Sequence, residues 1–444
     1  MSQPVCLCAE SRAASARRKN DSLLHSPSLE RSKMKIQDVV YSVGRSGYFN
    51  KDLLAVKAHG RNNGSFVEGE PLTPGYRAIV QPGAIISVML VLEDGTVAIG
   101  ECADVIFSGL AGRDPLFVPA DHLPMLDTTI RAWLVGRDVS TFRANAEEID
   151  RMDVQGKRLH TSLRYGLTQA LLAATAAAHR KTQAEIVAAE YGSTLRTAPV
   201  DLLASCHRGD SLQLDRVIMK QAAVLPHASF TMAVDLGPGA IELTNYARSI
   251  AKRIQEVGAP GYKPRIHLDL YGTLGDLFGA DVEALTDYIA SLAQVVAPFD
   301  LLLESPVIAA TQAEQIQVFS QLKAGLAKRG ARVGLIADEW CNTLEDVRLF
   351  AEAKASDYVQ IKTPDLGGIN NTIEAVLFCK ANGMGCCLGG TANETDLSAR
   401  ITAQIAMATH PDFMLSKPGI GADEGIMILT NEMLRTLALA QRRS

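Results

Sequence analysis

The chain has 444 residues, of which 47% are hydrophobic and 21% are charged. That composition is ordinary for a globular protein, and the length allows two or three domains at ~150 residues per domain, or ~250 for a TIM barrel. The 44 Lys and Arg residues against 49 Asp and Glu residues give a net charge of -5. This balance argues against a partner such as nucleic acid or an anionic membrane. No apolar run reaches the ~18 residues of a membrane span.

The cysteines indicate the cellular compartment. The chain has eight of them, and no two have the CxxC spacing. A disulfide-rich secreted domain would carry far more cysteines for its length. We therefore expect reduced thiols in a cytoplasmic protein.

Residues 1–33 differ from the rest of the chain. They are rich in Ser and Arg and lack the apolar segment of a secretory signal. A transit peptide is an alternative, but the acidic residues Glu10, Asp21 and Glu30 oppose it. We interpret the segment as a disordered tail or an over-extended start. Met34 is a sensible start, because an alternating strand pattern begins just after it.

Residues 34–192 are predicted to form an N-terminal α+β domain. The apolar run 85–92 is followed by Glu-Asp-Gly and by a second short strand at 96–100, which together predict a β-hairpin. From residue 123 onward the pattern is helical, and residues 163–189 carry apolar side chains at helical spacing.

Residues 193–444 alternate short apolar strands with amphipathic helices. The expected strands are 200–204, 230–234, 265–270, 301–304, 333–337, 358–361, 385–388 and 414–415, the second being the weakest assignment. The expected helices include 281–296, 311–328, 344–353, 369–381 and 393–408. Strands separated by helices predict parallel βα units, and eight of them predict a closed (β/α)8 barrel of TIM type, with a C-terminal helix after the last strand.

Three consecutive barrel strands are predicted to end in a carboxylate. Asp269, Glu304 and Asp338 follow the third, fourth and fifth apolar runs, and Glu339 comes directly after Asp338. A single Asp in this place is usually a helix cap or a turn residue. Three of them at one rim would repel one another without a counter-cation, and hard oxygen ligands favour Mg²⁺ or Mn²⁺. The pattern therefore predicts a divalent metal site.

The sixth strand is predicted to deliver a lysine to the same rim. Lys362 follows the run Tyr-Val-Gln-Ile, although a lone lysine is most often a solvated surface charge. A nearby dication disfavours the ammonium form, so we expect a lowered pKa and a neutral side chain that can act as a general base. A metal and a base together fit proton abstraction next to a carboxylate, with the metal stabilising the enediolate.

The order of short motifs is specific. The runs HLDLYG, LESP, ADEWCNT, QIKTPDLGG, KANGMG, GGTANET and KPGIGADEG closely resemble methylaspartate ammonia-lyase, a member of the enolase superfamily, over essentially residues 34–443. The resemblance implies an enolase-like α/β fold, with an N-terminal α+β capping domain over the barrel. It also implies elimination of ammonia from L-threo-3-methylaspartate to give mesaconate, use of Mg²⁺ with a monovalent cation such as K⁺, and a homodimer.

The resemblance also assigns roles by motif. It implies that Asp269, Glu304 and Asp338 bind the metal, that Lys362 removes the C3 proton, and that His227 serves the other C3 epimer from the opposite face. The positions it implies for the substrate carboxylates, amine and methyl group are Gln81, Gln169, Gln360, Thr391, Ala392 and Leu415. Ala392 stands where the family often has Cys; a backbone N–H contact there would tolerate Ala.

Two alternatives remain open at this point. One is another reaction of the enolase superfamily, such as dehydration of acid sugars, although an amine-binding pocket with the apolar Leu415 points away from it. The other is a non-catalytic barrel that binds a dicarboxylate or serves as a scaffold. The second strand has no KxK pair, which argues against the racemase and lactonising branches. The residues do not distinguish a role in glutamate degradation from one in acetyl-unit assimilation.

Overall fold

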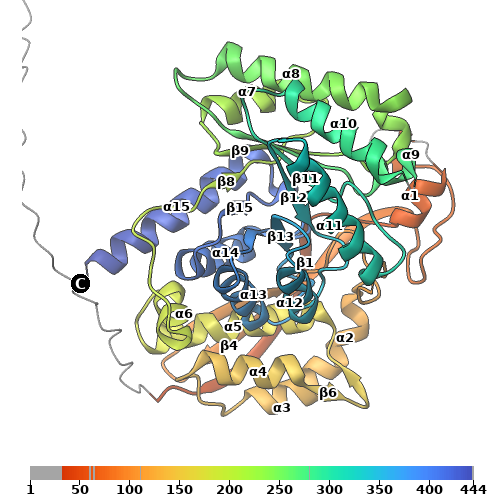
Figure 1. The fold of residues 1–444 in the computed structure, drawn as a ribbon. Helices are drawn as coiled ribbons and strands as arrows, with labels where there is room; N and C mark the ends of the chain where they lie inside the picture. The colour runs from red at the N-terminus through yellow and green to blue at the C-terminus, as the bar shows by residue number, and fades with distance from the viewer. Residues whose placement is uncertain (1–32, 60–61, 64–65, 111, 280, 443–444) are drawn as a thin grey trace, which may run out of the picture.

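The computed structural model describes residues 33–442, except 60–61, 64–65, 111 and 280 (Figure 1). The interpretation of residues 1–33 as a tail therefore lies, apart from Lys33, outside the described residues. Within the described part of the chain, no helix combines the length and the apolar character needed to cross a membrane.

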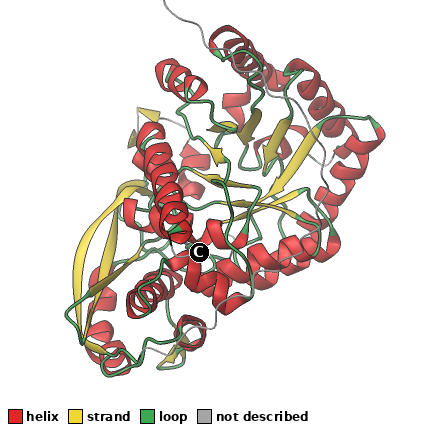
Figure 2. Cartoon of the chain, turned by 90° about the vertical axis from the view of Figure 1, so that its left-hand side faces the viewer, coloured by secondary structure: helices red, strands yellow, loops and turns green. Residues whose placement is uncertain are grey.

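The first half of the chain builds a cap around a three-stranded antiparallel sheet. Its strands β1 (Ile36–Lys51), β4 (Val80–Leu92) and β5 (Val97–Cys102) lie in the order β1-β4-β5. In β4, side chains alternate between buried and half-buried from Ile86 to Leu92, as expected for a strand with one face on a core. The β4–β5 hairpin is where the sequence predicts it, and both strands extend further than predicted. Figure 2 shows these long strands to one side of the shorter barrel strands.

The cap also contains six α-helices and one π-helix among its described residues. They are α1 (Leu53–His59), α2 (Pro119–Met125), the π-helix η1 (Leu126–Ile130), α3 (Arg131–Leu134), α4 (Phe142–Arg151), α5 (Thr161–Ala178) and α6 (Gln183–Tyr191). Of these, α5 packs on β4 and β5, α2 on β4 and α3 on β1. Two-stranded pairs complete the cap: β2 (Asn62–Asn63) with β3 (Phe66–Val67), and β6 (Asp153–Val154) with β7 (Lys157–Arg158).

Helix α5 is buried on nearly every side because it lies between the cap sheet and the barrel. Its approach to β5 requires two glycines: a Cβ on Gly100 would lie 2.1 Å from the carbonyl oxygen of Gly166, and one on Gly166 would lie 2.4 Å from the backbone nitrogen of Cys102. On its other side, the hydroxyl of Thr168 accepts a hydrogen bond from the backbone of Ile369 in the barrel. Helix α5 therefore forms part of the interface between the cap and the barrel.

The second half of the chain forms a closed eight-stranded barrel, as predicted. The strands, in spatial order around it, are β8 (Leu202–Leu203), β9 (Val224–Ser229), β10 (Arg265–Asp269), β11 (Leu301–Glu304), β12 (Val333–Ala337), β13 (Tyr358–Ile361), β14 (Gly385–Leu388) and β15 (Phe413–Leu415). All pair in parallel. The interior is filled by a layer of side chains: Leu203, Val224, Leu302, Ile336, Cys387, Phe413 and Leu415. The barrel is therefore a packed core that presents its chemistry at one end.

The prediction of the second barrel strand at 230–234 was wrong. The strand is Val224–Ser229, and the predicted segment runs into a 3₁₀ helix, η2 (Ala233–Leu236), in which Val234 is 75% exposed. Pro226 and His227 interrupt the apolar pattern of the true strand, and the run after it is more apolar. Local pattern alone therefore favoured the wrong segment.

Helices surround the barrel (Figure 2). They are α7 (Ser211–Met219), α8 (Ile241–Val257), α9 (Thr273–Phe278), α10 (Val282–Val295), α11 (Gln312–Lys328), α12 (Leu344–Ala353), α13 (Ile369–Ala381), α14 (Asp396–Thr409) and α15 (Ala422–Gln441), with 3₁₀ turns η3 (Pro238–Ala240) and η4 (Pro418–Ile420). Helix α14 starts three residues later than predicted, because Thr395 caps it by accepting from the backbone nitrogen of Ser398. The residues before it belong to a loop at the site.

Candidate active site

A cavity of about 410 Å³ lies between the cap and the end of the barrel where β10 and β11 finish. Eight of the predicted site residues line it: His227, Asp269, Glu304, Gln360, Lys362, Thr391, Ala392 and Leu415. Asp338 adjoins it, because its carboxylate contacts Lys362. A second hollow, of about 470 Å³, lies on the cap beside α4, and none of the predicted site residues lines it. The first cavity is therefore the candidate active site.

The three predicted carboxylates are buried at this rim. Asp269 and Glu304 are the last residues of β10 and β11, Asp338 directly follows β12, and none is more than 2% exposed. Burial and the charges of Glu304, Glu339 and Asp338 raise the pKa of Asp269 well above its usual range. Burial and Asp338 likewise raise the pKa of Glu304 to about 7. Three buried carboxylates this close together can all be ionised only when a cation lies between them.

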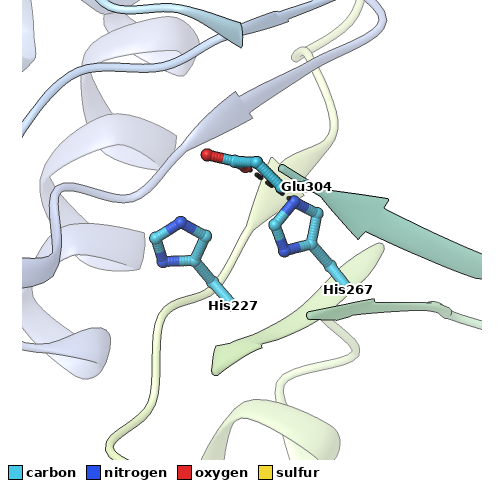
Figure 3. A group of neighbouring side chains, drawn as sticks. All are labelled: His227, His267 and Glu304. Atoms are coloured by element: carbon cyan, nitrogen blue, oxygen red, sulfur yellow. Dashed lines mark ion pairs between the residues drawn. The ribbon is translucent and has the colours of Figure 1, made fainter. Parts of the chain in front are cut away.

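Each carboxylate has a different neighbour in the structure. Glu304 Oε2 lies 3.0 Å from His267 Nε2, Asp338 Oδ2 lies 2.7 Å from Lys362 Nζ, and Asp269 Oδ2 lies 3.9 Å from His227 Nε2. Among the described residues, one group brings three possible metal-ligand atoms within 4.8 Å of one another. It consists of His227, His267 and Glu304 and is shown in Figure 3. The three predicted ligands do not form such a group.

The donor atoms decide which ligand set fits a metal better. Both oxygens of Asp269 are buried without a hydrogen-bond partner among the described residues, which leaves them free for a cation. A set of two imidazoles and one carboxylate suits zinc, whereas a set of carboxylate oxygens suits Mg²⁺ or Mn²⁺. The residues present therefore fit a hard divalent ion held by Asp269, Glu304 and Asp338.

Asp338 sets the charge of Lys362 in this structure. Burial alone would lower its pKa, but the carboxylate of Asp338, at 2.7 Å, outweighs burial and raises the pKa above the usual lysine value. The lysine is therefore an ammonium when Asp338 is its direct partner. A neutral Lys362 requires that a cation take over the charge of Asp338.

His227 reaches the site through an irregular strand. Between His267 and Leu268 the register of β10 against β9 skips one residue, so that His227 is an extra, bulged residue. Its φ of 52° lies in the left-handed region, which turns its side chain to the cavity. Burial lowers the pKa of His227 to about 4, so the ring is neutral near pH 7. Strands β9 and β13 are four apart in the eight-stranded barrel, which places His227 across from Lys362.

Gln360 supports Glu304. Its side-chain nitrogen donates to both carboxylate oxygens of Glu304, at 3.2 and 3.1 Å. The space for this amide depends on Gly389, because a Cβ there would lie 1.8 Å from Gln360 Oε1. The glycine after β14 therefore allows the glutamine on β13 to hold a candidate metal ligand.

This contact predicts the effect of Gly389→Ala. The new methyl group should push the Gln360 amide off Glu304 and lower kcat/KM by about 10- to 100-fold, with the fold retained. Steady-state kinetics at several Mg²⁺ concentrations would measure the loss. Gln360→Ala should cause a similar loss, and the double variant should lose little more than either single one. If the double variant instead lost as much activity as the two single variants together, Gly389 would act independently of Gln360.

Thr391 and Ala392 lie in a loop that joins the barrel to the cap. The Thr391 hydroxyl accepts a hydrogen bond from the backbone nitrogen of Ile106, at 3.2 Å, and the Thr391 backbone nitrogen donates to Glu394, at 2.8 Å. Glu394 is fully buried and is held in turn by Lys417 and by Tyr165 of α5. The cap must therefore be docked for this loop to keep its shape.

Two predicted substrate contacts lie outside the cavity. The side-chain oxygen of Gln81, at the start of β4, accepts from the backbone nitrogen of Arg77. Gln169 is fully buried in α5, and its amide exchanges hydrogen bonds with the backbone of Glu101 at 3.3 and 3.4 Å. Neither glutamine therefore lines the cavity in this structure, and Gln169 joins α5 to β5.

Other residues line the cavity that the sequence did not single out. Ser205 follows the first barrel strand and contacts His227 Nδ1 at 3.2 Å. The reasoning that found the carboxylates at strand ends would also have found Ser205, had it been extended to β8. Lys51, Ile106 and Arg113 come from the cap. No local signal marks them, because only the docking of the cap brings them to the barrel.

The carboxylate pKa values predict how Mg²⁺ stabilises the protein. The pKa of Glu304 is raised from 4.5 to about 7 in the folded protein, so its ionisation there is unfavourable. Below pH 4.5 the group is protonated and folding stability is unaffected. Once the pH exceeds 7, the ionised group lowers the free energy of unfolding by on the order of 3 kcal/mol. A bound cation removes this cost. The rise in Tm on adding Mg²⁺ to EDTA-treated protein should therefore grow between pH 5.5 and 8. Calorimetry would measure it, and a pH-independent rise would contradict the assignment.

The fold and the site define a class of protein. A closed parallel barrel below an α+β cap, with carboxylates ending successive strands and a lysine after the next, is the arrangement of the enolase superfamily. Muconate lactonizing enzyme from Pseudomonas putida has the same fold, with a TM-score of 0.58 at 15% identity, over 87% of this chain and 88% of that one. At that identity the likeness concerns the fold alone.

Within this class, the chain belongs to the methylaspartate ammonia-lyase family. The family models for the N-terminus and the C-terminus of methylaspartate ammonia-lyase match residues 34–192 and 194–442. The chain is 49% identical to methylaspartate ammonia-lyase 2 of Carboxydothermus hydrogenoformans over 414 residues, which are 92% of this chain and 99% of that protein.

Two solved structures are similar over nearly their whole length. The Citrobacter amalonaticus methylaspartate ammonia-lyase containing (2S,3S)-3-methylaspartic acid has a TM-score of 0.89 at 40% identity, over 92% of this chain and 100% of that one. The Mg complex of β-methylaspartase from Clostridium tetanomorphum has a TM-score of 0.86 at 43% identity, with the same coverage of 92% and 100%.

Proposed function

We propose that the protein eliminates ammonia from L-threo-3-methylaspartate to give mesaconate. The observation that carries this proposal is the group of buried carboxylates beside Lys362 at one end of the barrel, across from a neutral His227. Family membership supports the choice of substrate, since relatives of this chain are methylaspartate ammonia-lyases. The proposal makes the protein a carbon–nitrogen lyase that acts on a small amino dicarboxylate.

The metal has one role in this proposal. Asp269, Glu304 and Asp338 would hold Mg²⁺, which supplies Lewis-acid stabilisation of negative charge on the substrate carboxylate next to C3. Gln360 keeps Glu304 in place for this purpose. Mn²⁺ can fill the same oxygen site, and a monovalent cation such as K⁺ belongs to the proposal through the family resemblance alone.

Lys362 acts as the base. Its neutral amine takes the C3 proton, and the electron pair of the C–H bond moves into the adjacent carboxylate as an enediolate. Return of those electrons forms the C2–C3 double bond, and the C–N bond at C2 breaks with its electron pair on the departing ammonia. Lys362 keeps the abstracted proton and later releases it, so the neutral base is restored.

The remaining lining residues set the stereochemistry and shape. His227, across the barrel from Lys362, would remove the C3 proton of the other epimer. Leu415 ends β15 and is 2% exposed, so it provides an apolar surface for the substrate methyl group. Thr391 and Ala392 would hold polar groups of the substrate through their loop.

The cellular setting extends the same proposal. A homodimer in the cytoplasm that serves glutamate degradation is the setting that the family resemblance suggests. The six described cysteines are all free and buried, which agrees with a reducing compartment.

A substrate panel tests the proposal. The purified protein with Mg²⁺ and K⁺ should release ammonia and mesaconate in equal amounts from threo-3-methylaspartate, as measured by proton NMR and an ammonia assay. The erythro epimer should react through His227, and His227→Ala should lose that reaction selectively. Dehydration of an acid sugar without turnover of any amino acid would overturn the proposal in favour of the other superfamily reaction.

A further inference from the structure

Four long cationic side chains line the cavity, and three of them already have a carboxylate partner. Lys362 contacts Asp338, Arg113 Nε lies 2.8 Å from Asp365, and Arg208 Nη2 lies 2.6 Å from Asp235. A paired cation carries little net attraction for a further anion. The charges of these three side chains are therefore already balanced by carboxylates of the protein.

Lys51 is the exception. Its Nζ donates to the hydroxyl of Tyr48 at 3.3 Å and lies 4.9 Å from the centre of the same ring. No carboxylate of a described residue lies within 4.0 Å of this ammonium. The side chain is half-buried, and it lines the same cavity as Lys362 and Asp269. Among the described lysines and arginines that line the cavity, Lys51 is therefore the one without a carboxylate partner.

The backbone holds Lys51 at a defined place on the cap. It is the last residue of β1, its nitrogen donates to the carbonyl of Ile106 at 2.8 Å, and its carbonyl accepts from Tyr76 at 3.1 Å. The neighbouring Asn50 is 3% exposed and donates to the carbonyl of Val105 at 2.8 Å. Lys51 thus lines the cavity from the end of a hydrogen-bonded strand of the cap.

The substrate class of the proposed function needs such a cation. An amino dicarboxylate brings two carboxylates, and the metal site at the barrel rim accounts for one of them. Gln81 and Gln169, expected to share in binding the rest of the substrate, lie outside the cavity. The Thr391 hydroxyl is partly occupied by Ile106. A buried second carboxylate without a cationic partner would bind weakly.

We propose that Lys51 binds the second carboxylate of the substrate, the one away from the metal site, and thereby selects dicarboxylates over monocarboxylates. This inference rests on the proposed function. The cap supplies the cation, the barrel supplies the metal site, and the distance between them sets the length of substrate that both can hold. Lys51 is a specificity residue and takes no part in proton transfer.

A pair of product analogues tests this role. Mesaconate carries both carboxylates, and tiglate has the same skeleton with a methyl group in place of the second one. In calorimetric titrations of the Mg²⁺-loaded protein, Lys51→Met should weaken mesaconate binding roughly 10- to 100-fold and change tiglate binding less than about 2-fold. In turnover, KM should rise by a similar factor and kcat should stay within a few-fold, because the contact is the same in ground and transition states.

Matched variants separate the local role from general charge effects. Arg45→Met removes a positive charge from the same strand at an exposed position outside the cavity, and it should leave both affinities unchanged. Lys51→Arg should retain most of the mesaconate affinity. Equal mesaconate binding by Lys51→Met and the unaltered protein, or an equal loss for tiglate, would overturn the inference.

The two proposals fail in different ways. If the protein binds mesaconate through Lys51 but releases no ammonia from methylaspartate, the proposed function is wrong and the binding role stands. If it turns over methylaspartate and Lys51→Met has an unchanged KM, only the binding role is wrong. If the unaltered protein neither binds mesaconate nor turns over methylaspartate, both are overturned.

Discussion

Lys362→Ala should lower kcat by about 10³-fold or more while Mg²⁺ binding is retained. A positioned base contributes ~10²–10⁴-fold, and His227, the other proposed base, lies across the barrel from Lys362. The variant also removes the cation that contacts Asp338 at 2.7 Å. Without that competitor, the carboxylate group should bind Mg²⁺ at least as tightly as before.

Two measurements check this prediction. Calorimetry reports Mg²⁺ affinity, and single-turnover assays report the rate of mesaconate formation. His227→Ala is the matched control, because it removes the base on the opposite side and should leave turnover of the threo substrate largely intact. Residual activity of Lys362→Ala within 10-fold of the unaltered protein would refute the assignment of the base. Loss of Mg²⁺ binding would instead make Lys362 a structural residue.

Asp269→Asn should have opposite effects on function and on stability. Both oxygens of Asp269 are buried without a hydrogen-bond partner among the described residues, and burial together with neighbouring carboxylates raises its pKa. Removing its charge should weaken Mg²⁺ binding at least about 100-fold and lower kcat/KM accordingly. The same change relieves repulsion in EDTA-treated protein, whose Tm at pH 8 should rise on the order of 2 °C.

Asp235→Asn provides the control for this prediction. Asp235 also lines the cavity, but it is paired with Arg208 at 2.6 Å. Its substitution should leave Mg²⁺ affinity unchanged and should not raise Tm. If Asp269→Asn lowers the Tm of EDTA-treated protein and keeps Mg²⁺ affinity, Asp269 is a packing residue and the metal site lies elsewhere, for example at His227, His267 and Glu304.

The rim of the candidate active site was predictable because its signal is local. Four short apolar runs end at or next to Asp269, Glu304, Asp338 and Lys362, and a parallel barrel places such ends together. β11, β12, β13 and β14 have the predicted bounds. This part of the fold depends on the length of each strand and on the alternation of its side chains between the two faces. Both can be predicted from a few residues.

The position of His227 was harder to derive from local pattern. The bulge that turns it inward puts a left-handed residue in a strand that also contains Pro226, so the apolar pattern is broken where the strand lies. Motif resemblance singled out His227, which lines the cavity, whereas the strand prediction missed the strand that carries it. A motif was therefore enough to single out His227, whereas the strand that carries it could not be found from the apolar pattern.

The cap contribution could not be predicted from local pattern. Gln81 and Gln169 were chosen by motif, yet side-chain direction takes both away from the cavity. Lys51, Ile106 and Arg113 reach it only because β1 and the loop after β5 dock on the barrel, hundreds of residues away in sequence. Such contacts depend on tertiary packing and leave no periodic signal.

The ultraviolet absorbance of the purified protein with threo-3-methylaspartate, Mg²⁺ and K⁺ tests the account most directly, because mesaconate absorbs where the substrate does not. The account predicts a steady rise in absorbance with Mg²⁺, no rise with EDTA, and recovery when Mg²⁺ is restored. A rise that persists in EDTA would contradict the metal-assisted mechanism. No rise with any methylaspartate epimer at saturating Mg²⁺ would contradict the assigned reaction.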